Sequence, residues 1–132
     1  VTSQYNPEYG LRINADDGKI SVKNSMLRGN GSNGVYLVTD GDFYLYKVQA
    51  FSNGWGSGYP DDTGVFLFAG FDSNVEFRHC YIQANFGGGI LIYHDNPAFD
   101  YDLGGIYTAP YLQLYNTAYF GNGGTDLQVV IY

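Results

Sequence analysis

Several short groups of residues in this sequence have types and spacings that suggest chemistry. Gly29-x-Gly31-x-x-Gly34 has the spacing of a loop that binds nucleotide phosphates. Such a loop follows a strand and opens a helix, whereas here the last glycine begins the alternating run "GVYLV", which is typical of another strand. The three glycines therefore predict a turn between two strands, without a phosphate site.

Histidine and cysteine side chains offer metal binding or nucleophilic catalysis. His79 and His94, with Asp95 beside the second, lack the spacing of a zinc site. Cys80 is the only cysteine, so it forms no disulfide within one chain. It falls at an inward position of the strand pattern described next, which predicts a buried structural thiol and no nucleophile.

A repeated asparagine, followed by a strand-like run, organises the whole chain. The repeated residues are Asn6, Asn30, Asn53, Asn85 and Asn122. Each precedes a short turn and an alternating run such as "GVFLF" or "GILIY", and four of them follow two further runs. Alternation of this kind predicts strands with one buried face, and helical spacing fits none of the segments. Asn30 also begins a glycosylation sequon, but an asparagine in such a repeat is expected to be unavailable.

The side chains predicted to point inward form apolar or small columns when the repeats are superposed. For the first strands the columns are Ile20/Phe43/Val75/Leu112 and Val22/Leu45/Phe77/Leu114; for the second, Ser25/Val48/Cys80/Thr117 and Leu27/Ala50/Ile82/Tyr119; for the third, Leu11/Val35/Val65/Ile90/Leu127 and Ile13/Leu37/Leu67/Ile92/Val129. Three short strands per repeat, with like residues stacked, predict an all-β parallel β-helix (solenoid) of about 4–5 coils.

The two-plus-one strand rhythm, with an asparagine at the turn between second and third strands, resembles the right-handed parallel β-helix (pectate-lyase-like) superfamily. The resemblance covers nearly the whole chain and implies a right-handed solenoid with an asparagine ladder. Stacked asparagine amides then bond from coil to coil, and asparagine tolerates the left-handed backbone of a tight turn. We expect one domain, residues 1–132, with insertion loops at 54–62 and 94–111. This scaffold hosts many functions, so the resemblance assigns none.

Composition excludes several classes of partner. A net charge of −7 with six Lys and Arg argues against nucleic-acid binding, which needs clustered cations. No apolar run approaches the roughly 18 residues of a transmembrane segment. Few lysines with abundant Tyr, Asn and Gly resemble extracellular or cell-surface β-proteins.

In polysaccharide lyases of the resembled superfamily, substrate lies along the outer face of the first strands. The residues expected to bind it here are Tyr44, Tyr46, Glu76, Arg78 and Tyr115. The tyrosines would stack on sugar rings, while Arg78 and Lys23 would pair with uronate carboxylates. The alternative, which we favour, is that these side chains decorate a solvated sheet with opposite charges paired across coils.

A catalytic version of this face is a calcium-assisted lyase. Arg78 or Lys23 would abstract the proton beside the uronate carboxyl while a cation holds that carboxyl. Oxygen ligands for calcium would come from Asp72, Asp100 and Asp102. We favour a protein without catalysis and without a cofactor, and leave this alternative open.

The outward positions of the third strands are apolar where a solvated sheet would carry Thr, Lys or Glu. They include Tyr36, Phe66, Phe68, Leu91 and Tyr93. Such a stripe predicts a partner surface. Equally, the insertion at 54–62, with Trp55 and Tyr59, is predicted to fold over it.

The sequence shows no helix that would cap either end of the solenoid, and uncapped coils recruit strands from other chains. We therefore expect an extracellular structural module or subunit, of the filament, fibre, tail-spike or surface-adhesin type. It would self-associate, or continue in a longer chain, through its ends or the apolar stripe. The alternative is a carbohydrate-active module that binds or cleaves acidic polysaccharide.

Overall fold

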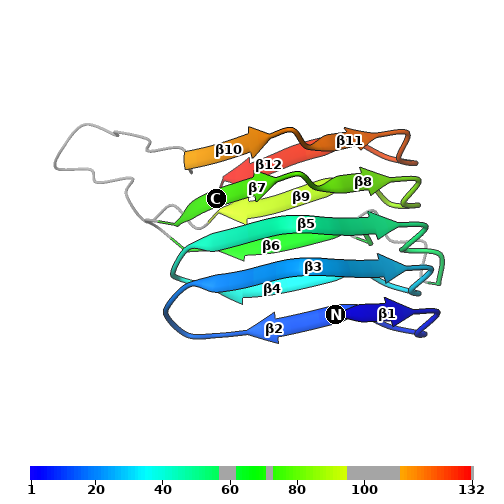
Figure 1. Cartoon of the computed structure of the whole chain (residues 1–132), viewed down its shortest axis with the longest axis horizontal. Coiled ribbons are helices and arrows are strands. Elements are labelled where there is room, and N and C mark those ends of the chain that lie inside the picture. Colours follow the sequence, from blue (N-terminus) through cyan, green and yellow to red (C-terminus); the bar gives the residue numbers. More distant parts are fainter. Residues whose placement is uncertain (57–61, 71–72, 95–110, 132) are drawn as a thin grey trace, which may run out of the picture.

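A computed structural model describes residues 1–56, 62–70, 73–94 and 111–131. These residues form strands and turns, which confirms the all-β prediction. Sheet A contains β1 (Thr2–Gln4), β3 (Ile20–Arg28), β5 (Phe43–Phe51), β7 (Asn74–Arg78), β8 (Tyr81–Gln83), β10 (Tyr111–Tyr115) and β11 (Ala118–Phe120). Sheet B contains β2 (Leu11–Asn14), β4 (Val35–Thr39), β6 (Val65–Ala69), β9 (Ile90–His94) and β12 (Leu127–Ile131). Figure 1 shows the two sheets facing each other along the stack.

All strand pairs are parallel and join equivalent positions of successive coils. Ile20 pairs with Phe43, Phe43 with Val75, and Val75 with Leu112, as the inward columns predicted. Val35, Val65 and Ile90 are paired in the same way in sheet B. A shift of one residue would turn every apolar side chain toward water, so the alternating pattern fixes the register.

The first and second strands of each coil belong to one sheet. In β3 and β5 they form a single continuous strand, and later in the chain they separate into β7/β8 and β10/β11. The junction is a residue with left-handed backbone, at φ 49° for Asn24, 52° for Lys47 and 52° for His79. The strands of each coil therefore belong to two sheets. Three separate strands per coil were predicted, but in β3 and β5 the first two are continuous.

The asparagine ladder is present and runs along one corner of the stack. The backbone N and Nδ2 of Asn30 both donate to Oδ1 of Asn53, at 3.1 and 2.9 Å. Asn53 donates in the same way to Asn85, and Asn85 to Asn122. At Asn122 the acceptor is Oδ1 of Asp126, which receives both bonds, at 3.1 and 2.8 Å.

One part of the ladder prediction was wrong. The left-handed backbone belongs to the residue before each asparagine, as at Ser52 (φ 56°) and Ala84 (φ 56°), and not to the asparagine itself. The asparagine is used for its amide, because one side chain both accepts from the previous rung and donates to the next. Asn30 is fully buried, so its sequon is inaccessible.

A glycine directly precedes the third strand in four coils, where the ladder lies against it. A Cβ added at Gly34 would stand 2.6 Å from Nδ2 of Asn53, and one at Gly64 would stand 2.4 Å from Nδ2 of Asn85. Such distances leave no room for a side chain. Each of these glycines and the ladder asparagine of the following coil are thus two halves of one contact between coils.

The interior is a single apolar core, in which Phe43, Leu45 and Phe77 are almost completely buried. Most of the two predicted insertion loops, 54–62 and 94–111, lies outside the described residues, and the assignment of residues 1–132 to one domain stays a prediction. Within the described part of the chain, no helix is long and apolar enough to span a membrane.

Candidate functional site

The outer face of the first strands, here called the sheet A face, brings together all the residues predicted to bind sugar. Tyr44 of β5 pairs with Glu76 of β7. Tyr46 pairs with Arg78, and Arg78 pairs with Tyr115 of β10. Strand alternation points these side chains outward, so five residues from three coils share one surface.

The cations of the sheet A face lie over its tyrosine rings. Nζ of Lys23 is 5.6 Å from the ring centre of Tyr44, and Nζ of Lys19 is 4.9 Å from the same ring. Nζ of Lys47 lies 5.2 Å from the ring centre of Tyr46. These separations are typical of cation–π contacts, which hold the charges on the protein surface.

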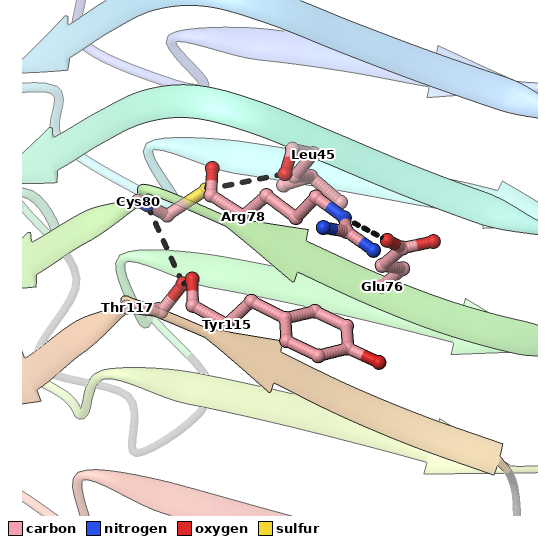
Figure 2. Close-up of polar contacts among 6 residues, drawn as sticks. All are labelled: Leu45, Glu76, Arg78, Cys80, Tyr115 and Thr117. Carbon is pink, nitrogen blue, oxygen red and sulfur yellow. Dashed lines mark hydrogen bonds and ion pairs between the residues drawn. The ribbon is translucent and has the colours of Figure 1, made fainter.

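Arg78 has partners on both sides, as Figure 2 shows. Its Nε forms an ion pair with Oε1 of Glu76, and its Cζ lies 4.2 Å from the ring centre of Tyr115. The hydrogen bond with Glu76 is the main cause that raises the pKa of Arg78 above its ordinary value. A general base must lose its proton near neutral pH, so this environment does not favour Arg78 in that role.

A shallow cavity of about 240 Å³ adjoins the tyrosines of the sheet A face. Lys19, Asp42, Tyr44, Asn74, Glu76 and Gln113 line it. Oδ1 of Asp42 accepts bonds from the backbone N and Nδ2 of Asn74, at 2.9 and 3.1 Å. The rings of Tyr44 and Tyr46 are parallel within 4°, with centres 6.3 Å apart. The arrangement can bind one hydroxylated ring against Tyr44.

The metal hypotheses gain no support from the described residues. Asp72, Asp100 and Asp102 lie outside them, as does Asp95. Across residues 1–56, 62–70, 73–94 and 111–131, no group of three or more His, Cys, Asp or Glu side chains is placed to hold a metal ion. His79 is an exposed turn residue whose ring is nearly perpendicular to that of Tyr46, with ring centres 5.8 Å apart. His94 is the last residue of β9.

Cys80 is buried, as its inward position predicted. Its Sγ lies 3.3 Å from the carbonyl oxygen of Leu45, and its backbone N donates to Oγ1 of Thr117 at 3.4 Å (Figure 2). Burial raises the pKa of the thiol, despite hydrogen bonds from backbone groups that lower it. A buried neutral thiol is a poor nucleophile.

The apolar stripe of sheet B, residues Tyr36, Phe66, Phe68, Leu91 and Tyr93, forms a continuous stack. Ring centres are 4.9 Å apart for Tyr36 and Phe66 and 5.5 Å apart for Phe66 and Tyr93. Phe66 and Leu91 are buried, whereas Tyr36, Phe68 and Tyr93 are partly exposed. The stripe is therefore packed within the chain and still offers ring surface to solvent.

Sequence reasoning missed a groove formed by the turns that follow the ladder asparagines. Glu8, Tyr9, Arg12, Ser32, Trp55 and Asp62 contribute to its walls. The signal was present, because the ladder places the turns after Asn6, Asn30 and Asn53 directly above one another.

A family model described as a right-handed β-helix region matches residues 1–100. No curated protein and no solved structure matches the sequence. The family match agrees with the parallel strands, the ladder and the two stacked sheets. The chain therefore belongs to the right-handed β-helix family.

Proposed function

We propose that this chain is a structural, non-catalytic β-helix module of an extracellular protein. It associates with a second copy of itself through the apolar stripe. Filaments, fibres, tail spikes and surface adhesins are assemblies that would use a module of this kind.

The apolar stripe is the observation that carries this proposal. A sheet with one solvated face alternates apolar inward residues with polar outward ones. Sheet B instead presents stacked rings outward, and Tyr36, Phe68 and Tyr93 remain partly exposed. Contiguous apolar surface of this type is typical of protein interfaces.

The sheet A face supports the non-catalytic part of the proposal. Its cations lie over tyrosine rings, and Arg78 is held by Glu76. Groups satisfied in this way stabilise a surface, and they are not poised to exchange protons with a substrate.

Light scattering on the chain eluting from a size-exclusion column tests the association. We expect a dimer at high protein concentration that dissociates on dilution. Phe68→Lys places a charge on the stripe and should give a monomer. Gln49→Lys, at an exposed position of β5, is the matched control and should leave the dimer intact.

Two outcomes would contradict the proposal. A monomer at every concentration would remove self-association altogether. A series of larger species unaffected by Phe68→Lys would assign association to the strand edges, which is the other mode that the sequence predicts.

A second candidate function is binding or cleavage of acidic polysaccharide on the sheet A face. The parallel rings of Tyr44 and Tyr46 beside a cavity favour it, with Lys23 and Arg78 to meet uronate carboxylates. Polygalacturonate and alginate with added calcium are the probes, and the ultraviolet absorbance of an unsaturated product reports cleavage. Turnover that survives both Arg78→Ala and Lys23→Ala would remove these residues as bases.

A further inference from the structure

The groove beside the ladder corner, here called the turn groove, has a volume of about 680 Å³. Backbone hydrogen bonds between successive turns hold its floor. Gly31 N donates to the carbonyl oxygen of Asn6 at 2.7 Å, and Gly56 N donates to that of Gly31 at 2.8 Å. Ser32 N donates to the carbonyl oxygen of Glu8 at 3.0 Å. The groove is thus built by the same coil-to-coil stacking as the sheets, and its shape is largely preformed.

Trp55 presents an apolar ring on the wall of the turn groove. Its side chain is 55% exposed, although large apolar rings are usually covered. The indole Nε1 donates to the carbonyl oxygen of Gly29 at 2.7 Å, so the orientation of the ring is fixed. With the N–H group already bonded, the exposed part of Trp55 is its carbon surface, which suits stacking against a flat apolar face.

Charged groups of both signs line the same groove. The guanidinium of Arg12 is held 5.2 Å from the ring centre of Tyr9 and 5.3 Å from that of Tyr36. Glu8 is exposed on the opposite turn. The groove therefore combines one apolar platform with a fixed donor and an acceptor.

Asp62 adds an unsatisfied acceptor. Its Oδ1 accepts a bond from Oγ of Ser32 at 2.8 Å. Its Oδ2 is the one buried side-chain oxygen or nitrogen of the described residues that has no hydrogen-bond partner. A buried carboxylate oxygen without a partner is unfavourable, and this oxygen has almost no exposed surface. A molecule in the groove would therefore meet the Ser32–Asp62 pair at Ser32, which is partly exposed.

We propose that the turn groove binds a neutral saccharide. A sugar ring stacks its C–H face on Trp55, and its hydroxyl groups bond to Glu8, Arg12 and the Ser32–Asp62 pair. Hydroxyl groups both donate and accept, so they match a site that mixes carboxylates with a guanidinium. The turn groove adjoins the apolar stripe, because Tyr9 and Arg12 contact Tyr36, but its residues are not those of the sheet A face. Saccharide binding there does not depend on the proposed function.

The charges of the turn groove favour a neutral saccharide over a uronate or a calcium ion. Glu8 and Asp62 would repel a uronate, and Arg12 alone would have to offset both. Calcium takes about six to eight oxygen ligands, whereas two carboxylates line this groove. A neutral ring with many hydroxyls meets neither objection.

Trp55 is the only tryptophan, so its fluorescence reports directly on the turn groove. The chain is titrated with soluble fragments of cellulose, of mannan and of starch, and separately with polygalacturonate, calcium chloride and a proline-rich peptide. We expect at least one neutral fragment to shift or enhance the emission saturably, with little response to the other three probes. No response to any neutral fragment overturns the proposal, as does a saturable response confined to calcium, polygalacturonate or the peptide.

Calorimetry on variants then locates the binding. Trp55→Ala should weaken it about ten-fold or more, as expected when a stacking ring is lost, and Glu8→Gln several-fold without affecting folding. Phe86→Ala is the matched control, because Phe86 is 60% exposed and follows a ladder asparagine in a later coil. Equal weakening by Phe86→Ala and Trp55→Ala, or full affinity in Glu8→Gln, would overturn the site.

Discussion

Two columns of polar side chains run along the stack, one at the ladder corner and one on the sheet A face. At the corner, Asn53 is fully buried and both of its donors bond to one oxygen of the next rung. On the sheet A face, the side chains of Arg78 and Glu76 keep 42% and 28% of their surface exposed. Both columns stack from coil to coil, but water reaches the second column directly, whereas it reaches the ladder only at its exposed or partly exposed end rungs.

This difference separates the residues that hold the fold from those that are free to vary. A buried polar group without its partner loses far more than an exposed pair, which gains little over hydration. The ladder should therefore dominate stability. The sheet A face should respond weakly to substitution, which is the property expected of a surface available for binding.

Asn53→Ala should give the largest loss of stability, and it tests the contrast between the buried ladder and the exposed sheet A face. It removes the acceptor for both donors of Asn30 and the donors to Asn85 and to the carbonyl oxygen of Leu27. With several buried groups unsatisfied, we expect about 3–5 kcal/mol off the free energy of unfolding, measured by urea denaturation. Asn6→Ala, at the exposed first rung, is the control, and an equal loss there would contradict the dominance of burial.

Gly64→Ala tests the other half of the ladder contact. The added methyl group would stand 2.4 Å from Nδ2 of Asn85, so the rung or the strand must shift. We expect a loss of about 1–3 kcal/mol, as for other overpacked sites, from the same denaturation experiment. An unchanged denaturation midpoint would show that the ladder corner accommodates the added methyl group at little cost. Gly18→Ala, with no atom within 4 Å but φ at 98°, separates contact from backbone strain.

Asp126→Ala should have an intermediate effect, because Asp126 accepts both donors of Asn122 at the partly exposed last rung. We expect about 1–2 kcal/mol of destabilisation in thermal unfolding. Asp126→Asn keeps an acceptor oxygen and is the matched control. A similar loss in both variants would mean that the negative charge, and not the acceptor, supports the rung.

Cys80 gives a test that depends on pH. Burial raises its pKa in the folded chain above the ordinary thiol value of 9.0, so the folded state holds its proton where the unfolded state has lost it. Stability is therefore unaffected below that value and falls as pH rises above it. Denaturation midpoints at increasing pH should decline more steeply for the unmodified chain than for Cys80→Ala. Parallel declines would contradict a buried neutral thiol.

Arg78→Ala should give the smallest effect, although this side chain has two partners. Its ion pair with Glu76 and its contact with Tyr115 are both exposed to solvent. We expect a change in the denaturation midpoint below that of every ladder variant, and one that shrinks with added salt because ions screen exposed charges. A loss comparable with that of Asn53→Ala would remove the contrast between the two columns.

Much of the fold could be predicted because the two-residue period assigns each side chain to a face and the asparagines set the register. The position of the left-handed residue could not, since Ser52 and Ala84 have no marked preference for that backbone. The left-handed backbone is required by the direction in which the side-chain amide of the following asparagine must point. That direction is set by the stacking of the coils. The continuity of β3 and β5 through their bends is likewise a tertiary feature.

The candidate site was predicted only in part. The sharing of one face by Tyr44, Tyr46, Glu76, Arg78 and Tyr115 followed from alternation. The choice of partners did not, because long exposed side chains select contacts through their rotamers. The turn groove was missed for a different reason, since turns carry no period and their stacking is inherited from the ladder.

Each inner asparagine of the ladder accepts two hydrogen bonds from the coil before it and donates two to the coil after it. The same residues could therefore be repeated to add further coils. Duplicating residues 30–52, which comprise one turn with β4 and β5, would add one coil. Its asparagine would make the same hydrogen bonds as Asn30 makes now. Lengthening such a rod requires no new chemistry, only repetition.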